Sequence, residues 1–530
     1  MQRYVQQWSQ EGRKMKSFRF DRDYPITDTT EGKVRGFEQG GVLCFRGIRY
    51  AVAKRFHAPR KAPRHEEIYD ATSFGFVCPL LTKDHPQGEL YVPHRFWPQD
   101  EDCLNLNIWT PSLDGKRPVL VWLHGGGFSF GSAIEQIVID GYNMAHLGDA
   151  VVISVNHRLN ILGYFDLSDF GKEYENSGNA GTDDLIAALR WIKNNISSFG
   201  GDPENVTLFG QSGGGGKITA LLQTPAADGL YAKGFNMSGV LDRLNDAEGS
   251  GRELARAMMR TLKIDSVKAM EKVPYADLAA AYNRLVPRFR KAGKYVGCAP
   301  HPNRHYVGDP LVHGFRRETA HIPLLVGTVY GEFTAFAPGP YDKRTMTEKE
   351  QRTVILKYLD AKEEKKLEKL FREAYPERPL LDLLRLDLLF RVPTVRYLAA
   401  RSALNDKTYA YLFNMDQPLY GGLCPWHCSD IPYVFHNADM IEYPGGVPDA
   451  EKLQEEIFQA VMAFARTGNP ETDLLPAWPP CTPEQEHTMV LDAAPRCLVN
   501  HDHVLLAAAA DSLASVFPRI MADLSGQVQR

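Results

Sequence analysis

The fold is decided by the stretch Asn205-Val-Thr-Leu-Phe-Gly-Gln-Ser-Gly-Gly-Gly-Gly-Lys-Ile-Thr-Ala-Leu-Leu222. Within it, Gly210-Gln-Ser-Gly-Gly214 joins an apolar strand to an apolar helix and fits the pattern G-x-S-x-G. Strand, tight turn and helix are the setting of a nucleophile elbow, where glycines on either side make room for a strained serine. The turn would place the Ser212 hydroxyl at a helix N-terminus, where developing negative charge is favoured. We therefore predict that Ser212 is a covalent nucleophile.

A second glycine cluster, His124-Gly-Gly-Gly-Phe128, follows an apolar strand upstream. Acyl transfer creates an alkoxide that needs fixed hydrogen-bond donors, and backbone N–H groups meet that need without reorganisation. A loop of this HGGG type is the usual partner of a nucleophile elbow. We predict an oxyanion hole in which Gly126, Gly127 and Gly213 donate the N–H groups. His124 is expected to orient the loop and not to act as a catalyst.

Apolar runs alternate with helical patterns along the chain. Runs that are continuous, with no polar residue at every second position, are typical of parallel strands covered by helices on both faces. The pattern predicts an α/β protein of the α/β-hydrolase fold, with a large, mostly parallel central sheet flanked by helices. A helix is expected over residues 183–198, and helical insertions over 251–320 and 345–402. The predicted strands are 119–123, 150–155, 206–209, 233–237, 323–327 and 409–414.

Composition and charge limit the class of protein. The 530 residues are 44% apolar and 24% charged, with a formal net charge of −4. These values are ordinary for a soluble globular protein and point neither to nucleic acid nor to an anionic membrane. No apolar run approaches the roughly 18–20 residues that span a bilayer. We find no repeat and no long linker, and expect one domain over residues 1–530, with a mobile segment over residues 1–20.

The N-terminus and the cysteines bear on the compartment. The first twenty residues include basic side chains but lack the apolar core of a secretory signal. Eight cysteines in 530 residues are too sparse for a disulfide scaffold. Both observations predict a reduced, cytoplasmic setting.

Several longer sequence motifs are spread along the chain from one end to the other. They are Phe45-Arg-Gly-Ile-Arg-Tyr-Ala51, Glu101-Asp-Cys-Leu-Asn-Leu-Asn-Ile108, Asn156-His-Arg-Leu159, Gly178-Asn-Ala-Gly181, Phe199-Gly-Gly-Asp-Pro-Glu-Asn-Val-Thr-Leu-Phe-Gly-Gln-Ser212, Phe464-Ala-Arg-Thr-Gly-Asn-Pro470 and Trp478-Pro-Pro480. With these blocks in this order, the chain resembles the type-B carboxylesterases, the family of carboxylesterases and cholinesterases, in a bacterial-type form. The resemblance covers nearly the whole chain and implies a serine carboxylesterase.

The resemblance also implies the other two members of a catalytic triad. The acid of the family lies in a G-T-x-x-x-E segment, which here ends at Glu332, although Phe333 stands where a glycine usually follows. The histidine precedes an acidic residue and an apolar run, as His427 does before Asp430. The chain order Ser, Glu, His is the order of this fold.

The predicted chemistry is hydrolysis through an acyl-enzyme. His427 would take the Ser212 proton as Oγ attacks an ester carbonyl, then protonate the leaving alcohol, while Glu332 orients the imidazole. Gln211 stands where the family usually has glutamate, and a neutral side chain supplies no net attraction for a cation. The substrate is therefore expected to be a small neutral ester, not a choline ester. In addition, Gly213 replaces a usual alanine.

Residues around the triad carry further expectations. We expect Gln211, Ser238 and Asp430 to support the triad from behind, and Ser238 matches a family serine that is implied to support the acid. Cys424 and Cys428 flank His427, but zinc needs ligands that converge from several segments. We predict no metal and no cofactor. Cys78 and Cys103 are similar in position to a family disulfide, and without a signal they are expected to be free thiols.

Two other functions remain open. A non-catalytic, cholinesterase-like binding protein would have lost the nucleophile, whereas here the serine, the acid, the histidine and the glycine loop are all present. An amidase, thioesterase or acyltransferase would use the same machinery, and the sequence does not discriminate among them. The expected partner is a small-molecule ester, with no nucleic acid and no membrane. The oligomeric state does not follow from the sequence.

Overall fold

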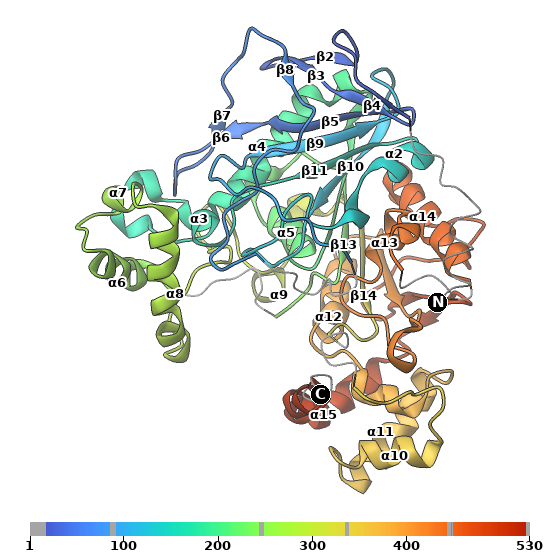
Figure 1. Ribbon diagram of the computed structural model, residues 1–530. Coiled ribbons are helices and arrows are strands. Elements are labelled where there is room, and N and C mark those ends of the chain that lie inside the picture. The colour runs from blue at the N-terminus through green and yellow to red at the C-terminus, as the bar shows by residue number, and fades with distance from the viewer. Residues whose placement is uncertain are drawn as a thin grey trace, which may run out of the picture.

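A computed structural model describes residues 17–84, 92–242, 249–333, 339–442, 447 and 449–525 of the chain. Its centre is a large twisted sheet with helices on both sides (Figure 1). In the described residues this sheet has twelve strands, in the spatial order β1 (Phe18–Arg19), β4 (Phe37–Gln39), β5 (Val42–Arg49), β9 (Asn105–Thr110), β11 (Val151–Val155), β10 (Arg117–Leu123), β12 (Gly201–Gln211), β13 (Lys233–Met237), β14 (Leu324–Val329), β15 (Thr408–Phe413), β16 (His487–Leu491) and β17 (Arg496–Val499).

The strands from β11 to β15 in this order are parallel, as predicted from the continuous apolar runs, and β16, which was not predicted, pairs parallel with β15. The strands at both edges pair antiparallel and were not predicted, because several are very short and some, such as β9 with β5 and β11, pair with residues far away in the chain. Two small sheets accompany the main one. They contain β2 (Ile26–Thr29), β3 (Gly32–Arg35) and β8 (Tyr69–Asp70), and β6 (Ala51–Val52) and β7 (Arg60–Lys61).

The helices surround the sheet and extend from it at two ends (Figure 1). Those of eight residues or more are α4 (Ala180–Asn195), α5 (Gly213–Leu222), α6 (Arg252–Leu262), α8 (Tyr275–Lys291), α10 (Glu348–Ile355), α11 (Ala361–Ala374), α12 (Arg391–Ser402), α14 (Ala450–Thr467) and α15 (His503–Ser525). The shorter ones are α2 (Tyr142–Gly148), α3 (Asn160–Gly163), α7 (Val267–Met270), α9 (Pro310–His313) and α13 (Ile431–Val434). Both predicted helical insertions are confirmed, and the helix expected at 183–198 begins at Ala180 and ends in a 3₁₀ turn over Ile196–Phe199.

Neighbouring residues of the central strands point to opposite faces, and each face has its own core. On one face, Leu120 and Trp122 pack with Phe209 and with apolar side chains of α14. On the other face, Val119 and Val121 pack with side chains of α4, α5 and α12. Both faces are therefore dry, which is why the parallel strands are apolar without alternation. This arrangement holds β10, β12 and the helix after β12 rigidly at the centre.

The N-terminal expectation is corrected in part. Residues 1–16 lie outside the described residues, but Phe18–Arg19 forms β1 and pairs with β4, so the end of the segment expected to be mobile belongs to the sheet. Among the described residues no single helix has the length and apolar composition to cross a membrane, while one bent pair, His503–Leu513 with Ser515–Asp523, meets that test by length and composition only.

Candidate active site

Ser212 lies in a strained turn between β12 and α5. Its φ of 55° and ψ of −122° are rare for a residue with a side chain. Two hydrogen bonds hold the turn: the Ser212 N–H donates to the Met237 carbonyl at 2.7 Å, and the Gly216 N–H donates to the Ser212 carbonyl at 3.0 Å. A Cβ added at Gly214 would lie 1.9 Å from the Leu123 oxygen, so only glycine fits there. The predicted strand, turn and helix are thus present.

The HGGG loop lies beside this turn because β10 and β12 are neighbours in the sheet. Leu123, the last residue of β10, pairs with Gly210 of β12. Gly126 and Gly127 both have left-handed backbones, with φ of 82° and 62°. A Cβ on Gly127 would meet nothing within 4 Å, whereas a Cβ on Gly213 would lie 2.4 Å from the Gly127 nitrogen. Gly127 and Gly213 therefore lie in contact, Gly126 directly precedes Gly127 in the loop, and the space on the Cβ side of Gly127 is open.

Glu332 and His427 are brought together by the loops after β14 and before α13. His427 Nδ1 lies 2.5 Å from Glu332 Oε2, and the His427 N–H donates to the Glu332 carbonyl at 2.5 Å. The other carboxylate oxygen accepts the Val329 N–H at 3.0 Å. Both side chains are buried. The imidazole is thereby oriented by an acid that is itself held from two sides.

The outer nitrogen of His427 faces the residue next to Ser212. Gln211 Nε2 lies 3.2 Å from His427 Nε2, and the Cys428 thiol donates to Gln211 Oε1 at 3.2 Å. With the ring proton on Nδ1 toward Glu332, Nε2 accepts from the Gln211 amide, and this is the tautomer that can take a proton. Within the described residues no hydrogen bond joins Ser212 Oγ to His427 Nε2. Gln211 thus contacts His427, and its supporting role stays a prediction.

Two phenylalanines pack on the His427 imidazole. The ring centroids of Phe333 and Phe390 lie 5.2 and 5.0 Å from that of His427. Phe333 occupies the position where the family usually has glycine, and its ring packs against the His427 imidazole. Phe390, at the start of α12, was not predicted, because Glu332 and His427 lie 95 positions apart and the segment between them carries no local signal of where it returns.

Asp430 forms a side-chain hydrogen bond, whereas the Ser238 hydroxyl forms none among the described residues. Asp430 Oδ2 accepts the Tyr411 hydroxyl at 2.7 Å, and burial raises the pKa of Asp430 to about 6, with the nearby Glu332 carboxylate acting in the same direction. Ser238 does not support Glu332 as expected: among the described residues its buried hydroxyl has no hydrogen-bond partner, and only its backbone N–H is used, donating to Gly327 at 2.8 Å. The positive φ of 47° at Ser238 indicates a turn residue.

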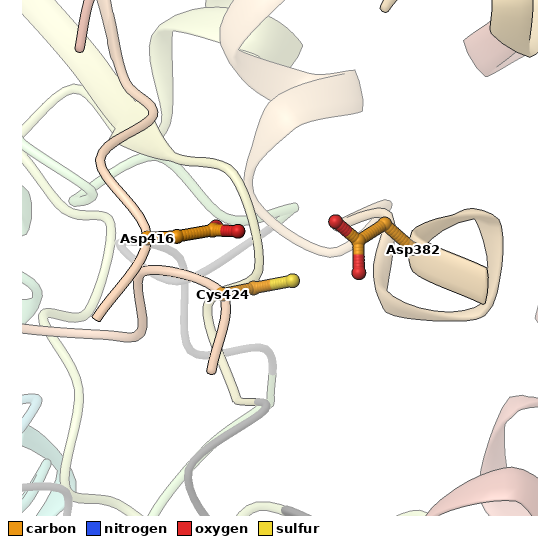
Figure 2. Close-up of side chains that lie close together, drawn as sticks. All are labelled: Asp382, Asp416 and Cys424. Atoms are coloured by element: carbon orange, nitrogen blue, oxygen red, sulfur yellow. The ribbon is translucent and has the colours of Figure 1, made fainter. Parts of the chain in front are cut away.

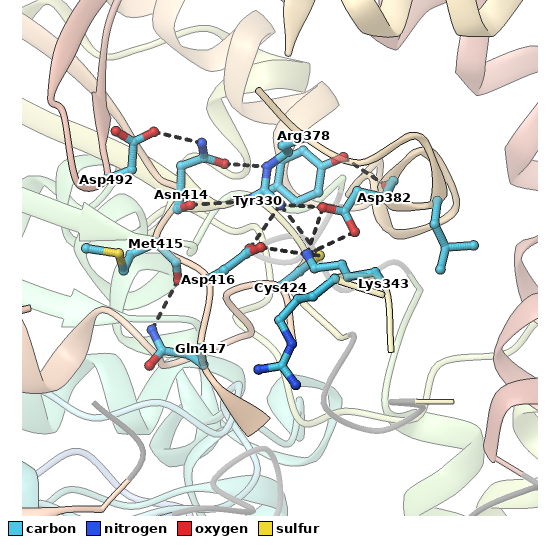
Figure 3. A network of polar contacts seen from close by, with 12 residues as sticks. Tyr330, Lys343, Arg378, Asp382, Asn414, Met415, Asp416, Gln417, Cys424 and Asp492 are labelled. Atoms are coloured by element: carbon cyan, nitrogen blue, oxygen red, sulfur yellow. Dashed lines mark hydrogen bonds and ion pairs between the residues drawn. The ribbon is translucent and has the colours of Figure 1, made fainter. Parts of the chain in front are cut away.

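A cluster of possible metal ligands lies near the loop that carries His427. Asp382, Asp416 and Cys424 place their ligand atoms within 4.8 Å of one another (Figure 2). Lys343 Nζ lies 2.8 Å from Asp382 and 2.6 Å from Asp416, and Arg378 contacts both carboxylates as well (Figure 3). The protein's own cations therefore neutralise the acids. We infer that these ion pairs stabilise the loop that carries Cys424 and His427. The absence of a metal stays a prediction.

The structure contains no disulfide among the eight cysteines, all of which lie in its described residues. The Cys103 thiol is hydrogen-bonded to Cys78, and this bond together with burial raises the pKa of Cys103 well above its usual value. The two cysteines whose positions match the family disulfide are thus neighbours that are not bonded to each other in this structure.

Comparison with known proteins identifies the class. Residues 23–505 match the Carboxylesterase family. The chain is 32% identical over 490 residues to the para-nitrobenzyl esterase of Bacillus subtilis (strain 168), covering 89% of this chain and 95% of the relative. It is 30% identical over 505 residues to the phenmedipham hydrolase of Pseudarthrobacter oxydans, covering 91% and 98%. The fold is therefore that of the α/β hydrolases, and the class is that of the carboxylic-ester hydrolases.

A solved structure agrees in detail. The esterase from anaerobic Clostridium hathewayi, described as able to hydrolyse aliphatic aromatic polyesters, superposes with a TM-score of 0.91 at 47% identity, covering 94% of this chain and all of that one. The chain belongs to the carboxylesterase family, and it is an enzyme.

Proposed function

We propose that the enzyme hydrolyses small neutral carboxyl esters through a Ser212–His427–Glu332 triad and an acyl-enzyme. The observation that carries the proposal is the pair of contacts on His427: Glu332 at Nδ1, and Gln211, the neighbour of Ser212, at Nε2. Reorientation of the Ser212 side chain and of the Gln211 amide would let Nε2 take the serine proton. Apo structures often show such hydrogen bonds unmade before substrate binds.

The reaction would follow two acyl transfers. Ser212 Oγ attacks the ester carbonyl while His427 accepts its proton, and the oxyanion is held by the N–H groups of Gly126, Gly127 and Gly213. His427 then gives the proton to the leaving alcohol. Water repeats the cycle on the acyl-enzyme and releases the acid.

The substrate proposal rests on charge and on relatives. Gln211 is neutral and buried, so the site offers no anionic side chain there to a cationic ester. The relatives named above act, by their names, on p-nitrobenzyl esters and on aliphatic aromatic polyesters. Aromatic esters are therefore included among the substrates to be tested, beside aliphatic esters of graded length.

The test is to label the enzyme with an organophosphate and to map the modified peptide. One modified serine, Ser212, is expected, and Ser212→Ala should lose activity. Label on another serine, or an active Ser212→Ala variant, would refute the assignment. A panel of p-nitrophenyl esters and the p-nitroanilide of the same acyl group separates an esterase from an amidase. An acyl-transfer assay and a thioester of that acyl group cover the remaining alternatives.

The surroundings of the enzyme are proposed as well. We treat residues 1–530 as one domain in a reduced cytoplasmic setting, acting on a small ester without nucleic acid or membrane. Thiol titration of the denatured, unreduced protein should then count all eight cysteines. A count of six would indicate a bridge between Cys78 and Cys103.

A further inference from the structure

A lysine is completely buried beneath the oxyanion loop. Lys217 belongs to α5, the helix that begins next to Ser212, and its side chain has 0% exposure. Its Nζ donates to the His124 carbonyl at 2.7 Å. His124 is the first residue of the loop that carries Gly126 and Gly127. A buried ammonium is costly unless it is well paired, and among the described residues the one hydrogen bond of this ammonium goes to the loop.

The helix aims Lys217 at the loop. Residues three and four apart share one face of a helix, so Gly213, Gly214 and Lys217 point the same way. A Cβ on Gly214 would lie 3.2 Å from the His124 oxygen, and a Cβ on Gly213 would lie 2.4 Å from the Gly127 nitrogen. One face of α5 therefore contacts the loop at two points. The Gly213 backbone lies against Gly127, and one helical turn further on the Lys217 ammonium binds the His124 carbonyl.

The rings around Lys217 are neutral. The Phe128 ring lies 6.0 Å from its Nζ, and the His124 and His157 rings stack at 5.2 Å. Burial lowers the pKa of both imidazoles well below the usual value, and the charge of Lys217 acts in the same direction.

Among the charged groups near this loop, Lys217 is the cation that changes its protonation state near neutral pH. Burial lowers the pKa of Lys217 to about 7, opposed by the Glu135 carboxylate. Arg158, whose charge also lowers the pKa of His157, is itself paired with Asp184 at 2.6 Å. Both imidazoles are thus neutral where the lysine still carries charge.

We propose that Lys217 is a positioning residue of the oxyanion hole. Its ammonium fixes the His124 carbonyl and hence the start of the turn that presents Gly126 and Gly127, and its positive charge favours the tetrahedral oxyanion over the neutral ester. The proposal rests on the proposed function of Ser212 and the glycine loop. Because negative charge develops only on the way to the transition state, the effect should fall on kcat and not on KM.

Two variants and one control test this role. Lys217→Met removes both the charge and the donor, and Lys217→Gln keeps a donor without the charge. Thr219→Val is the control: it removes a hydroxyl of the same helix that lies 3.0 Å from the Tyr397 hydroxyl, away from the loop. kcat and KM are measured on p-nitrophenyl butyrate, together with the inhibition constant of a trifluoromethyl ketone, whose adduct with serine carries the oxyanion.

Lys217→Met is expected to lower kcat by roughly 10- to 100-fold, somewhat less than the loss of an oxyanion-hole donor itself, with little change in KM. The inhibition constant of the ketone should rise by about the same factor as kcat/KM falls. Lys217→Gln should lie in between, and Thr219→Val should match the wild type. The ratio of wild-type to Lys217→Met kcat should shrink as the pH rises from 6 to 9, because Lys217 loses its proton while His124 and His157 are already neutral.

Other results would overturn the role. These are a Lys217→Met kcat close to that of the wild type, a fall in kcat with unchanged ketone affinity, or a ratio that does not vary with pH. If Lys217→Met does not fold, Lys217→Gln carries the same three measurements. Ser212→Ala separates the two proposals: an active Ser212→Ala means that the proposed function fails, whereas an inactive Ser212→Ala with a fully active Lys217→Met means that only the positioning role fails.

Discussion

Gly213 lies so close to Gly127 that a methyl group on Gly213 would come within 2.2 Å of the Gly127 oxygen and 2.4 Å of its nitrogen. The nucleophile turn and the oxyanion loop are therefore fitted to each other backbone against backbone. The chain resembles a family in which alanine is usual at this position. Here the contact leaves no room for it, so the glycine sets how closely the two halves of the oxyanion hole approach.

Gly213→Ala is expected to lower kcat by roughly 100-fold or more, the order seen when one oxyanion-hole donor is lost, because Gly127 must move away from the added methyl group. The variant is compared with the wild type in kcat and KM, and thermal unfolding shows whether the fold is kept. A folded variant with kcat near the wild-type value would mean that the loop can shift without losing its donors.

Glu332→Gln should lower kcat by roughly 10⁴-fold, as the equivalent change does in a serine-protease triad, with little effect on KM. The amide keeps the shape of the acid but can donate to Nδ1, which favours the wrong tautomer of His427. Steady-state kinetics from pH 5 to 9 check this. A variant that retains most of its activity would show that the acid is misassigned, and Asp430→Asn would then be the next variant to test.

Gln211→Glu tests the charge argument on substrate choice. The carboxylate should raise the ratio of kcat/KM for an acylcholine to that for a neutral ester of the same acyl length, because it attracts the cation. The ratio is used because both replacements of Gln211 remove the amide that now lies 3.2 Å from His427 Nε2, which changes activity on both esters. Gln211→Met is the matched control, since it removes the amide without adding charge and should leave the ratio unchanged. An unchanged ratio in Gln211→Glu would remove charge as the reason for the preference.

Asp430→Asn should change how stability depends on pH. Burial raises the pKa of Asp430 to about 6, so the native protein keeps a proton that the unfolded chain loses near pH 4. The native state is therefore disfavoured increasingly as the pH rises from about 4 to 6, by up to about 3 kcal/mol above pH 6. Asparagine keeps an acceptor for the Tyr411 hydroxyl and has no such cost.

The measurement is urea unfolding of Asp430→Asn and wild type at pH 4.5 and pH 8. The free energy of unfolding of the variant minus that of the wild type should be more positive at pH 8 than at pH 4.5, because only the wild type carries the cost of ionising Asp430. Equal differences at the two pH values would mean that Asp430 stays ionised throughout.

Much of the fold follows from local patterns. Strand β13 occupies the predicted residues 233–237, and β14 and β15 lie within a residue or two of their predicted positions, because continuous apolar runs are a strong signal for buried parallel strands. The boundary of β12 is less well predicted: it begins at Gly201, five residues early, since polar residues at a strand end carry little periodic signal. The edge strands β1, β4 and β17 are only two to four residues long, too short to show such a pattern.

The sequence by itself determined the strand, turn and helix around Ser212, the glycine loop and the chain order of the proposed triad residues, because each is a short motif whose residues are neighbours in the chain or match a known family. Only the tertiary structure decided what surrounds His427: the Gln211 amide with its Cys428 partner, and the rings of Phe333 and Phe390. It also showed that Ser238 does not bond to Glu332, and that Lys217 is buried under the oxyanion loop. The physical reason is that a hydrogen bond depends on ångström-scale placement of side chains from separate segments, which packing sets and no local pattern records.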